Sequence, residues 1–402
     1  MTPTIDSVMI EDPAFYDNPF ETYARLRATD RVYCREDLRL WLLTGYDEVV
    51  AVSKQARLFS CREGILLADF IEGKSFADEY FAGPELIVTT DPPRHNELRR
   101  LISPAFTPRR VAQLEDDVRQ TARALVGRLP AREQVDFISM AAEILPLVVI
   151  SKLLGITSDD ISGMARWSDE LLKLGQDMTE AERQESVRVF TQMNGFMKAQ
   201  FAEKRARPAA DLLSMLVSVE LDNEKISDDN ILMWASLVLA GGNETTRALM
   251  GNMVYALGTH QDQLELLAGN RGLTGQMVEE TLRWRGVVNG FGRRVTEDTQ
   301  LGGKMIPAGD AVYMLYPAAN RDPEVFANPE AYDITAERDR EHVAFGVGQH
   351  FCPGNLLARL EARVLMEELV DRFPRWEVVT GAPIVSTLRV GFSDLQVIFR
   401  EA

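Results

Sequence analysis

The sequence predicts a mainly α-helical protein with small β-sheets, and three observations support this. Most of residues 110–285 follows a helical pattern, and segments with strand character are few and short. Hydrophobic residues make up 46% of the 402 residues and charged residues 26%, which is typical of a globular protein rather than a disordered one. No linker or repeat interrupts the chain, so we expect residues 1–402 to form a single domain.

The expected strands lie outside the helical region. Their signals cover residues 39–44, 300–306, 311–315 and 396–399. With so few strands among so much helix, we expect small sheets packed beside a large helical body.

The charge and cysteine counts exclude several classes of protein. Lys plus Arg is 44 and Asp plus Glu is 61, which gives a net charge of −17 and argues against nucleic-acid binding over the general surface. The three cysteines, Cys34, Cys61 and Cys352, lie far apart and form no zinc-ligand spacing. The N-terminus lacks a basic segment followed by an apolar one, and no apolar run is long enough for a membrane span. We therefore expect a cytoplasmic protein without a membrane anchor.

One long helix is predicted over residues 229–257. Ser227 is a suitable N-cap, and residues 231–240 are apolar on every side, which is typical of a buried helix. Gly241 and Gly242 then weaken the helix, and Glu244 follows them. Two interpretations stay open at this point: the helix reaches the surface there and Glu244 is solvated, or this turn opens a polar pocket.

The segment FGVGQHFCPG at residues 345–354 is the most informative stretch of the chain. It fails as a dinucleotide fingerprint because residue 351 is Phe where glycine is needed. Glycines permit a tight turn and a close approach of the backbone to a flat ligand, and Pro353 is suited to the first position of a helix. Cys352 would then lie at a helix N-terminus, where the dipole stabilises a thiolate. The alternative is a structural cysteine, which is a common role for a buried free thiol.

This segment resembles the haem-binding signature of the cytochrome P450 family. Phe345, Gly348, Cys352 and Gly354 match its four fixed positions. Further segments resemble the same family in the expected order: residues 91–100 (DPPxHxxxR), 242–246 (the oxygen-activating turn), 280–283 (ExxR) and 319–323 (the meander). The resemblance covers nearly the whole chain and implies the P450 fold, a triangular helical prism with a long central helix over the haem.

The resemblance implies a set of cofactor contacts. Haem b would be bound with Cys352 as the axial ligand to iron, since a thiolate ligand favours O–O cleavage. It implies that cations bind the haem propionates and that small and aromatic residues line the haem. The implied cations are His95, Arg99, Arg293 and His350; the implied lining residues are Phe345, Gly348, Gly354, Gly241 and Gly242.

Three further roles follow from the resemblance. Glu280 and Arg283 would form a structural ion pair, with Arg338 as our choice for its third member. Thr245 and Glu244 would deliver protons to bound dioxygen. Electrons would come from NAD(P)H through a ferredoxin reductase and an acidic ferredoxin that docks on the thiolate side. The arginines expected there are Arg100, Arg109, Arg110, Arg359 and Arg363; the alternative is that they are solvated helix cations.

We therefore expect a monomeric monooxygenase that hydroxylates a terpenoid, steroid, fatty acyl chain or macrocycle with O₂. The alternatives are a relative that rearranges or couples its substrate, and a haem sensor without catalysis. The family's pocket segments are apolar in this chain, which indicates an apolar substrate, and Asn289 could orient a substrate oxygen. The expected apolar pocket residues are Ile65, Leu66, Leu67, Phe70, Phe76, Leu237, Val238, Val287, Val288, Phe291 and Phe392.

Overall fold

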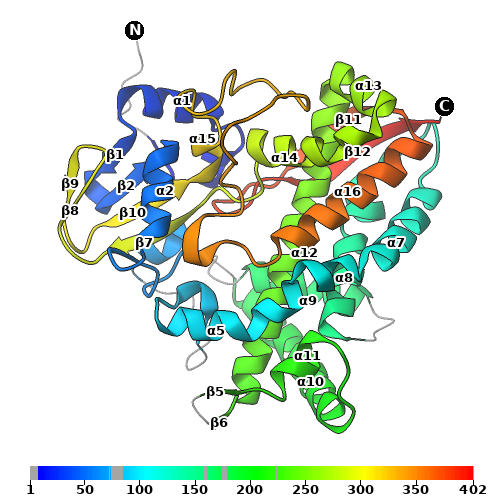
Figure 1. Ribbon diagram of the computed structural model, residues 1–402, viewed down its shortest axis with the longest axis horizontal. Helices are drawn as coiled ribbons and strands as arrows, with labels where there is room; N and C mark the ends of the chain where they lie inside the picture. Colours follow the sequence, from blue (N-terminus) through cyan, green and yellow to red (C-terminus); the bar gives the residue numbers. More distant parts are fainter. Residues whose placement is uncertain are drawn as a thin grey trace.

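A computed structural model describes residues 8–71, 73, 85–156, 161–173, 179–221 and 224–401. Figure 1 shows a sheet-rich side beside a larger helical body, with helix α12 (Asp228–Thr259) running through the middle. This is the mainly helical fold with small sheets that the sequence predicts. None of the described helices is long and apolar enough to cross a membrane.

The larger sheet of the described residues has five strands in the order β1-β2-β10-β7-β3. Strand β10 is parallel to β2 and antiparallel to β7, and its Val312 lies opposite Arg293 of β7. The strands are β1 (Val32–Arg35), β2 (Leu40–Leu43), β3 (Phe59–Ser60), β7 (Gly290–Val295) and β10 (Ala311–Leu315).

A second sheet and two short hairpins complete the described β-structure. The order β11-β12-β4 joins the C-terminal strands to a segment from the first half of the chain. These strands are β4 (Gln134–Asp136), β11 (Arg375–Pro383), β12 (Phe392–Arg400), and the hairpins β5 (Glu220–Leu221) with β6 (Glu224–Lys225) and β8 (Thr299–Leu301) with β9 (Lys304–Ile306). All four predicted strand segments are confirmed, since they fall on β2, β8–β9, β10 and β12.

The helices of the larger body pack around α12, whose start follows from its sequence. The Ser227 hydroxyl accepts a hydrogen bond from the Asn230 amide, and Asp228 and Asp229 place negative charge in the first turn. The remaining helices are α1 (Phe20–Thr29), α2 (Tyr46–Lys54), α3 (Leu67–Ile71), α5 (Arg94–Ile102), α6 (Pro108–Ala112), α7 (Glu115–Arg128), α8 (Ile144–Leu154), α9 (Ile161–Lys173), α10 (Glu180–Ala206), α11 (Leu212–Leu216), α13 (Gln261–Gly269), α14 (Thr274–Trp284), α15 (Tyr316–Ala319) and α16 (Asn355–Arg372).

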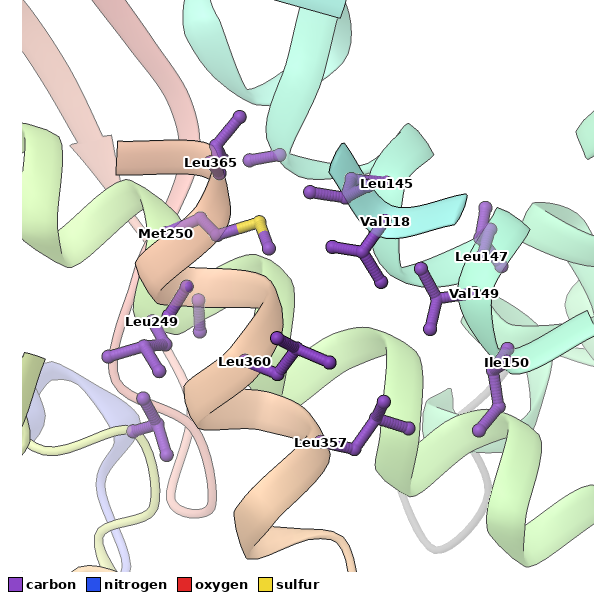
Figure 2. Close-up of a cluster of buried hydrophobic side chains, with 14 of the residues drawn as sticks. Val118, Leu145, Leu147, Val149, Ile150, Leu249, Met250, Leu357, Leu360 and Leu365 are labelled. Atoms are coloured by element: carbon purple, nitrogen blue, oxygen red, sulfur yellow. The ribbon is translucent and has the colours of Figure 1, made fainter. Parts of the chain in front are cut away.

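The main core lies where α12 meets α7, α8 and α16. Figure 2 shows Leu249 and Met250 of α12 beside Leu360 and Leu365 of α16, with Val118 of α7 facing them. All of these side chains are buried. The burial of apolar surface at this junction fixes α16, and with it the loop of residues 345–354 that precedes α16.

Candidate functional site

The loop that carries Cys352 is held by its own backbone. The Cys352 amide donates to the Phe345 carbonyl at 2.9 Å, and Gly346 and Gly348 have φ values of 71° and 75°. A Cβ on Gly348 would lie 2.6 Å from the Ser53 carbonyl oxygen, so this glycine is required by the end of α2 rather than by a flat ligand. Gly348 therefore lies in the loop as predicted, but the contact that requires a glycine there is the one with α2.

The environment of the Cys352 thiol differs from the predicted one in two respects. Helix α16 begins at Asn355, so Pro353 precedes the helix and does not occupy its first position. Burial raises the pKa of Cys352, although the Gly354 amide and the charge of Arg99 act in the opposite direction. A bound metal ion would deprotonate the thiol.

Four predicted cations gather next to this loop. The rings of His95 and His350 have centroids 4.2 Å apart, and Arg99 Nη2 donates to the Phe351 carbonyl at 2.6 Å. Burial and then the charge of Arg293 lower the pKa of His350 to about 3. The structure thus brings His95, Arg99, Arg293 and His350 together, from α5, β7 and the loop before α16. The charges of Arg99 and Arg293 beside the two imidazole rings favour binding of an anion.

A buried nitrogen in this cluster lacks a partner. His95 is 1% exposed, its Nδ1 lies 3.3 Å from Asn96 Oδ1, and its Nε2 has no hydrogen-bond partner among the described residues. A buried polar atom without a partner is costly, and a carboxylate oxygen could satisfy it. The cluster therefore fits an acidic group of a ligand.

The turn of α12 after residue 240 stays helical. The Thr245 hydroxyl donates to the Gly241 carbonyl at 2.7 Å. A Cβ on Gly241 would meet open space, whereas one on Gly242 would lie 2.7 Å from Cδ1 of Ile150 in α8. Gly242 therefore serves helix packing, which corrects our expectation that it opens a groove, and only Gly241 lies beside free space.

Glu244 is buried, which decides between the two interpretations of this turn. It is 2% exposed, and its Oε2 lies 2.6 Å from Arg389 Nη1 and 2.9 Å from Arg247 Nη2. The Asn243 amide donates to its Oε1 at 3.2 Å. A carboxylate in the interior needs such cations, so the interpretation with a solvated Glu244 is wrong, and a polar pocket at this turn stays a prediction.

The predicted structural ion pair forms as expected. Glu280 is 4% exposed and Arg283 is 1% exposed, and their atoms Oε1 and Nη2 lie 2.8 Å apart. Arg338 Nη2 reaches the same carboxylate at 2.9 Å, so our choice of a third member is confirmed. Arg283 also donates to the carbonyls of Pro329 and Ala331, which ties the meander to α14.

Comparisons with known proteins agree with this geometry. The sequence profile described as Cytochrome P450 matches residues 170–392. Cytochrome P450 107B1 of Saccharopolyspora erythraea is 36% identical over 382 residues, covering 93% of this chain and 92% of that protein. The chain belongs to the cytochrome P450 family. It is a P450 monooxygenase, an oxidoreductase that inserts one atom of O₂ into its substrate.

Two further P450 proteins extend the comparison. A steroid C26-monooxygenase of Mycobacterium tuberculosis is 33% identical and covers 90% of this chain and 88% of its own length. The structure of a mutant of P450 EryK in complex with erythromycin B has a TM-score of 0.85 and 28% identity, covering 97% of this chain and 98% of that one. The fold of this P450 is therefore that of its relatives over almost the whole chain.

Haem is the cofactor of this family, and the residues of this P450 fit it. Within the described part of the chain, no group of three His, Cys, Asp or Glu side chains could hold a metal ion. The unpartnered His95 Nε2 and the surrounding cations suit the two haem propionates. Cys352 would hold the iron, and Gly241 would leave room on α12 for the ring and its ligands.

The predicted substrate-pocket residues divide into two groups. Four of them are half-buried. Leu237 and Val238 lie in α12 just before its polar turn, Phe291 lies in β7, and Val288 lies in the segment before β7. Ile65 and Leu66 are also half-buried, and their amides donate to Asp69 Oδ2, both at 2.8 Å. These six stay predictions for the pocket, and Phe76 lies outside the described residues.

The other predicted pocket residues pack against protein in the described structure. Phe70 fills the space over Gly292, where a Cβ would lie 2.1 Å from its ring, and Leu67 is in the same cluster. Phe392 packs on Tyr255 at 4.7 Å, and Val287 is 5% exposed. These four residues also stay predictions for the pocket.

Asn289 is fully buried, and its Nδ2 donates to the Ser386 carbonyl at 3.0 Å. Its Oδ1 is buried and has no hydrogen-bond partner among the described residues, so its role toward a substrate oxygen stays a prediction. Asn289 holds the loop of residues 384–391 in place.

The thiolate-side arginines differ in how far they are neutralised. Arg359 Nε and Nη2 lie 2.7 and 2.8 Å from the two oxygens of Glu279, and Arg363 pairs with Glu115 and Glu367. Arg110 donates to the Ala210 carbonyl. Arg100 and Arg109 are exposed, and no ion pair links either of them to another residue that the structure describes. These two are the most available cations of the predicted set.

Sequence reasoning missed the two arginines that pair with Glu244. Arg247 stands three residues after Glu244 on the same helix, so the spacing alone could have indicated it. Arg389 is separated from Glu244 by 145 positions and comes from the loop between β11 and β12. No local pattern in the sequence could have indicated that contact.

Proposed function

We propose that this P450 hydroxylates a hydrophobic small molecule with O₂ and two electrons from a ferredoxin. The observation that carries the proposal is the turn of α12, where the Thr245 hydroxyl lies next to Glu244, a buried ionic side chain beside free space at Gly241. Oxygen activation needs protons at a defined place, and a hydroxyl with an adjacent acid can supply them.

The residues of the chain divide this task. Bound haem supplies the activation of dioxygen. The Thr245 hydroxyl, which donates to the Gly241 carbonyl, keeps its lone pairs free to accept a hydrogen bond from water. Glu244 passes protons from outside toward Thr245, and this requires its carboxylate to exchange contacts with Arg247 and Arg389. The arginines hold the Glu244 carboxylate in place between transfers.

The substrate we propose is apolar: a terpenoid, steroid, fatty acyl chain or macrocycle. The half-buried apolar side chains near α12 and on β7 support this, since apolar pockets bind apolar ligands. The names of the relatives support it too, because one acts on a steroid and another was solved with erythromycin B.

We further propose that the electrons come from NAD(P)H through a ferredoxin reductase and an acidic ferredoxin. Arg100 and Arg109 support a docking site on the thiolate side, because exposed cations attract an acidic partner.

We also propose that residues 1–402 form a single domain that carries the whole reaction. Two sheets support this, because the sheet that contains β1 and β10 and the sheet that contains β4 and β12 both link distant parts of the chain.

Two measurements test this function. The first is a spectral titration of the ferric protein with a library of hydrophobic compounds, in which we expect some to displace water from the iron. The second compares turnover of a bound compound driven by ferredoxin with turnover driven by hydrogen peroxide. Hydroxylated product in the ferredoxin reaction supports the proposal. A rearranged or coupled product, or binding without any turnover, would instead assign this P450 to a non-hydroxylating enzyme or a sensor.

A further inference from the structure

The carboxylate of Asp91, near the cation cluster, is held by Ser60, Cys61 and Arg62, and the Arg62 Nε lies 3.4 Å from its Oδ2. Asp91, which precedes α5, is 9% exposed. Its Oδ1 accepts hydrogen bonds from the Cys61 amide at 3.0 Å and from the Cys61 thiol at 3.2 Å, and its Oδ2 accepts one from the Ser60 hydroxyl at 2.5 Å. Ser60 ends β3, so these bonds connect the edge of the larger sheet to the start of α5.

The Cys61 sulfur reaches the histidine pair. Its Sγ lies 3.6 Å from His350 Nε2, and Cys61 is fully buried. Burial raises the pKa of Cys61 to about 12, so the group is a thiol with one hydrogen to donate. An ionised Asp91 can only accept, so that hydrogen goes to Asp91 and the sulfur is left to accept from His350.

This contact fixes the orientation of one ring in the candidate propionate site. With Nε2 of His350 turned toward sulfur, the ring lies 4.2 Å from that of His95, whose own Nε2 is unpartnered. The same Asp91 precedes His95 by one turn, and the His95 amide donates to the Asp91 carbonyl at 3.0 Å. Both histidines are therefore positioned by one aspartate, one through the backbone and one through Cys61.

We propose that Asp91 and Cys61 are positioning residues for the haem propionates, acting through His350 and His95. The inference rests on haem binding, and does not depend on the substrate or the electron donor proposed above. Neither residue contacts the reacting centre. Their role is to hold the His350 ring in place beside His95, whose unpartnered Nε2 is the atom that meets a propionate.

The test is made on the haem-loaded protein with Cys61→Ala, Cys61→Ser and Asp91→Asn. Haem transfer to excess apomyoglobin and the midpoint potential of the iron are measured beside thermal unfolding. We expect Cys61→Ala and Asp91→Asn to release haem about three- to tenfold faster, the range for losing one hydrogen bond, and to shift the potential. Cys61→Ser retains a donor and an acceptor and should recover most of the wild-type behaviour.

Cys34→Ala, on β1 at the other edge of the same sheet, is the matched control and should leave haem release unchanged. Unchanged haem release and potential in Cys61→Ala would overturn the proposal. Equal effects of Cys61→Ser and Cys61→Ala would overturn it as well, because the volume of the side chain rather than its hydrogen bonds would then matter.

Discussion

At the scale of single residues, the proposed oxygen activation depends most directly on Thr245. Its hydroxyl is held at 2.7 Å from the Gly241 carbonyl, one helical turn away. We expect Thr245→Ala to release more hydrogen peroxide and to lower product formed per reducing equivalent by roughly tenfold or more, since a positioned proton donor contributes about 10²-fold or more. Thr246→Ala, a buried neighbour, is the control. Unchanged coupling in Thr245→Ala would assign the proton delivery to another group.

Cys352 can be tested without any substrate. We expect Cys352→Ser and Cys352→His to abolish the red-shifted absorption band that reduced, carbon monoxide-bound members of this family show, because that band depends on a thiolate ligand. Cys61 and Cys34 remain in both variants as internal controls. A variant that kept the band would have another axial ligand, and the assignment of Cys352 would be wrong.

Glu361 of α16 is a buried acid outside the site. It is 2% exposed, its Oε2 has no partner among the described residues, and burial raises its pKa well above 4.5. Above pH 4.5, Glu361 therefore keeps its proton in the folded state and loses it in the unfolded state. Because of this difference, the free energy of unfolding falls as the pH rises, until the pH passes the pKa of Glu361 in the folded state.

We expect Glu361→Gln to remove this dependence. Relative to the wild type, the variant should gain up to about 1.4 kcal/mol per pH unit above the unfolded pKa, on top of a constant offset from the new amide. The measurement is urea unfolding between pH 5 and pH 9 (roughly the range in which folded P450 can be studied). Parallel stability curves for the two proteins would show that Glu361 is ionised in the fold.

At the scale of elements, Glu244 joins α12 to the loop between β11 and β12. The ion pair between Glu244 and Arg389 is the contact that links these two elements. We expect Arg389→Ala to destabilise the protein by about 1–3 kcal/mol, because a buried carboxylate loses one of its partners. In the double variant with Glu244→Gln, most of this loss should disappear, which a double-mutant cycle measures. Additive losses would mean that the pair contributes nothing of its own.

At the scale of the whole molecule, charge opposes the docking that the proposed reaction needs. The chain carries −17, so an acidic ferredoxin is repelled at long range and must meet a local cationic patch. Since salt screens charges over about 8 Å under physiological conditions, the nearest exposed arginines decide the encounter. Arg109 is exposed, whereas Arg359 is held by Glu279.

We therefore expect Arg109→Glu to slow reduction by ferredoxin, mainly through the association rate, and to weaken its dependence on salt. Arg359→Glu should also slow it, but with a loss of stability from the repulsion of Glu279. Arg25→Glu on α1 changes the charge equally and serves as the control. Stopped-flow reduction at several salt concentrations measures these rates. If Arg109→Glu and Arg25→Glu behave alike, the docking face lies elsewhere.

The sequence by itself determined the family and the course of α12, and it predicted Cys352 as the thiolate ligand. Each of these depends on residues close together in the chain: the loop of residues 345–354, the Ser227 cap, and the pair Glu244 and Thr245. Such groups keep their relative geometry in any fold that preserves the local backbone. The ion pair of Glu280 and Arg283 was predictable for the same reason, because their spacing places them on one face of a helix.

Only the tertiary structure decided which of the predicted residues are neighbours and what each one contacts. Arg389 reaches Glu244 from 145 positions away, and Cys61 reaches His350 from 289 positions away. It also decided that Phe70 and Phe392 pack in the core, while Leu237 stays half-buried. The physical reason is that hydrophobicity drives a side chain out of water without selecting its partner, so an apolar residue satisfied by protein and one satisfied by a substrate look alike in the sequence.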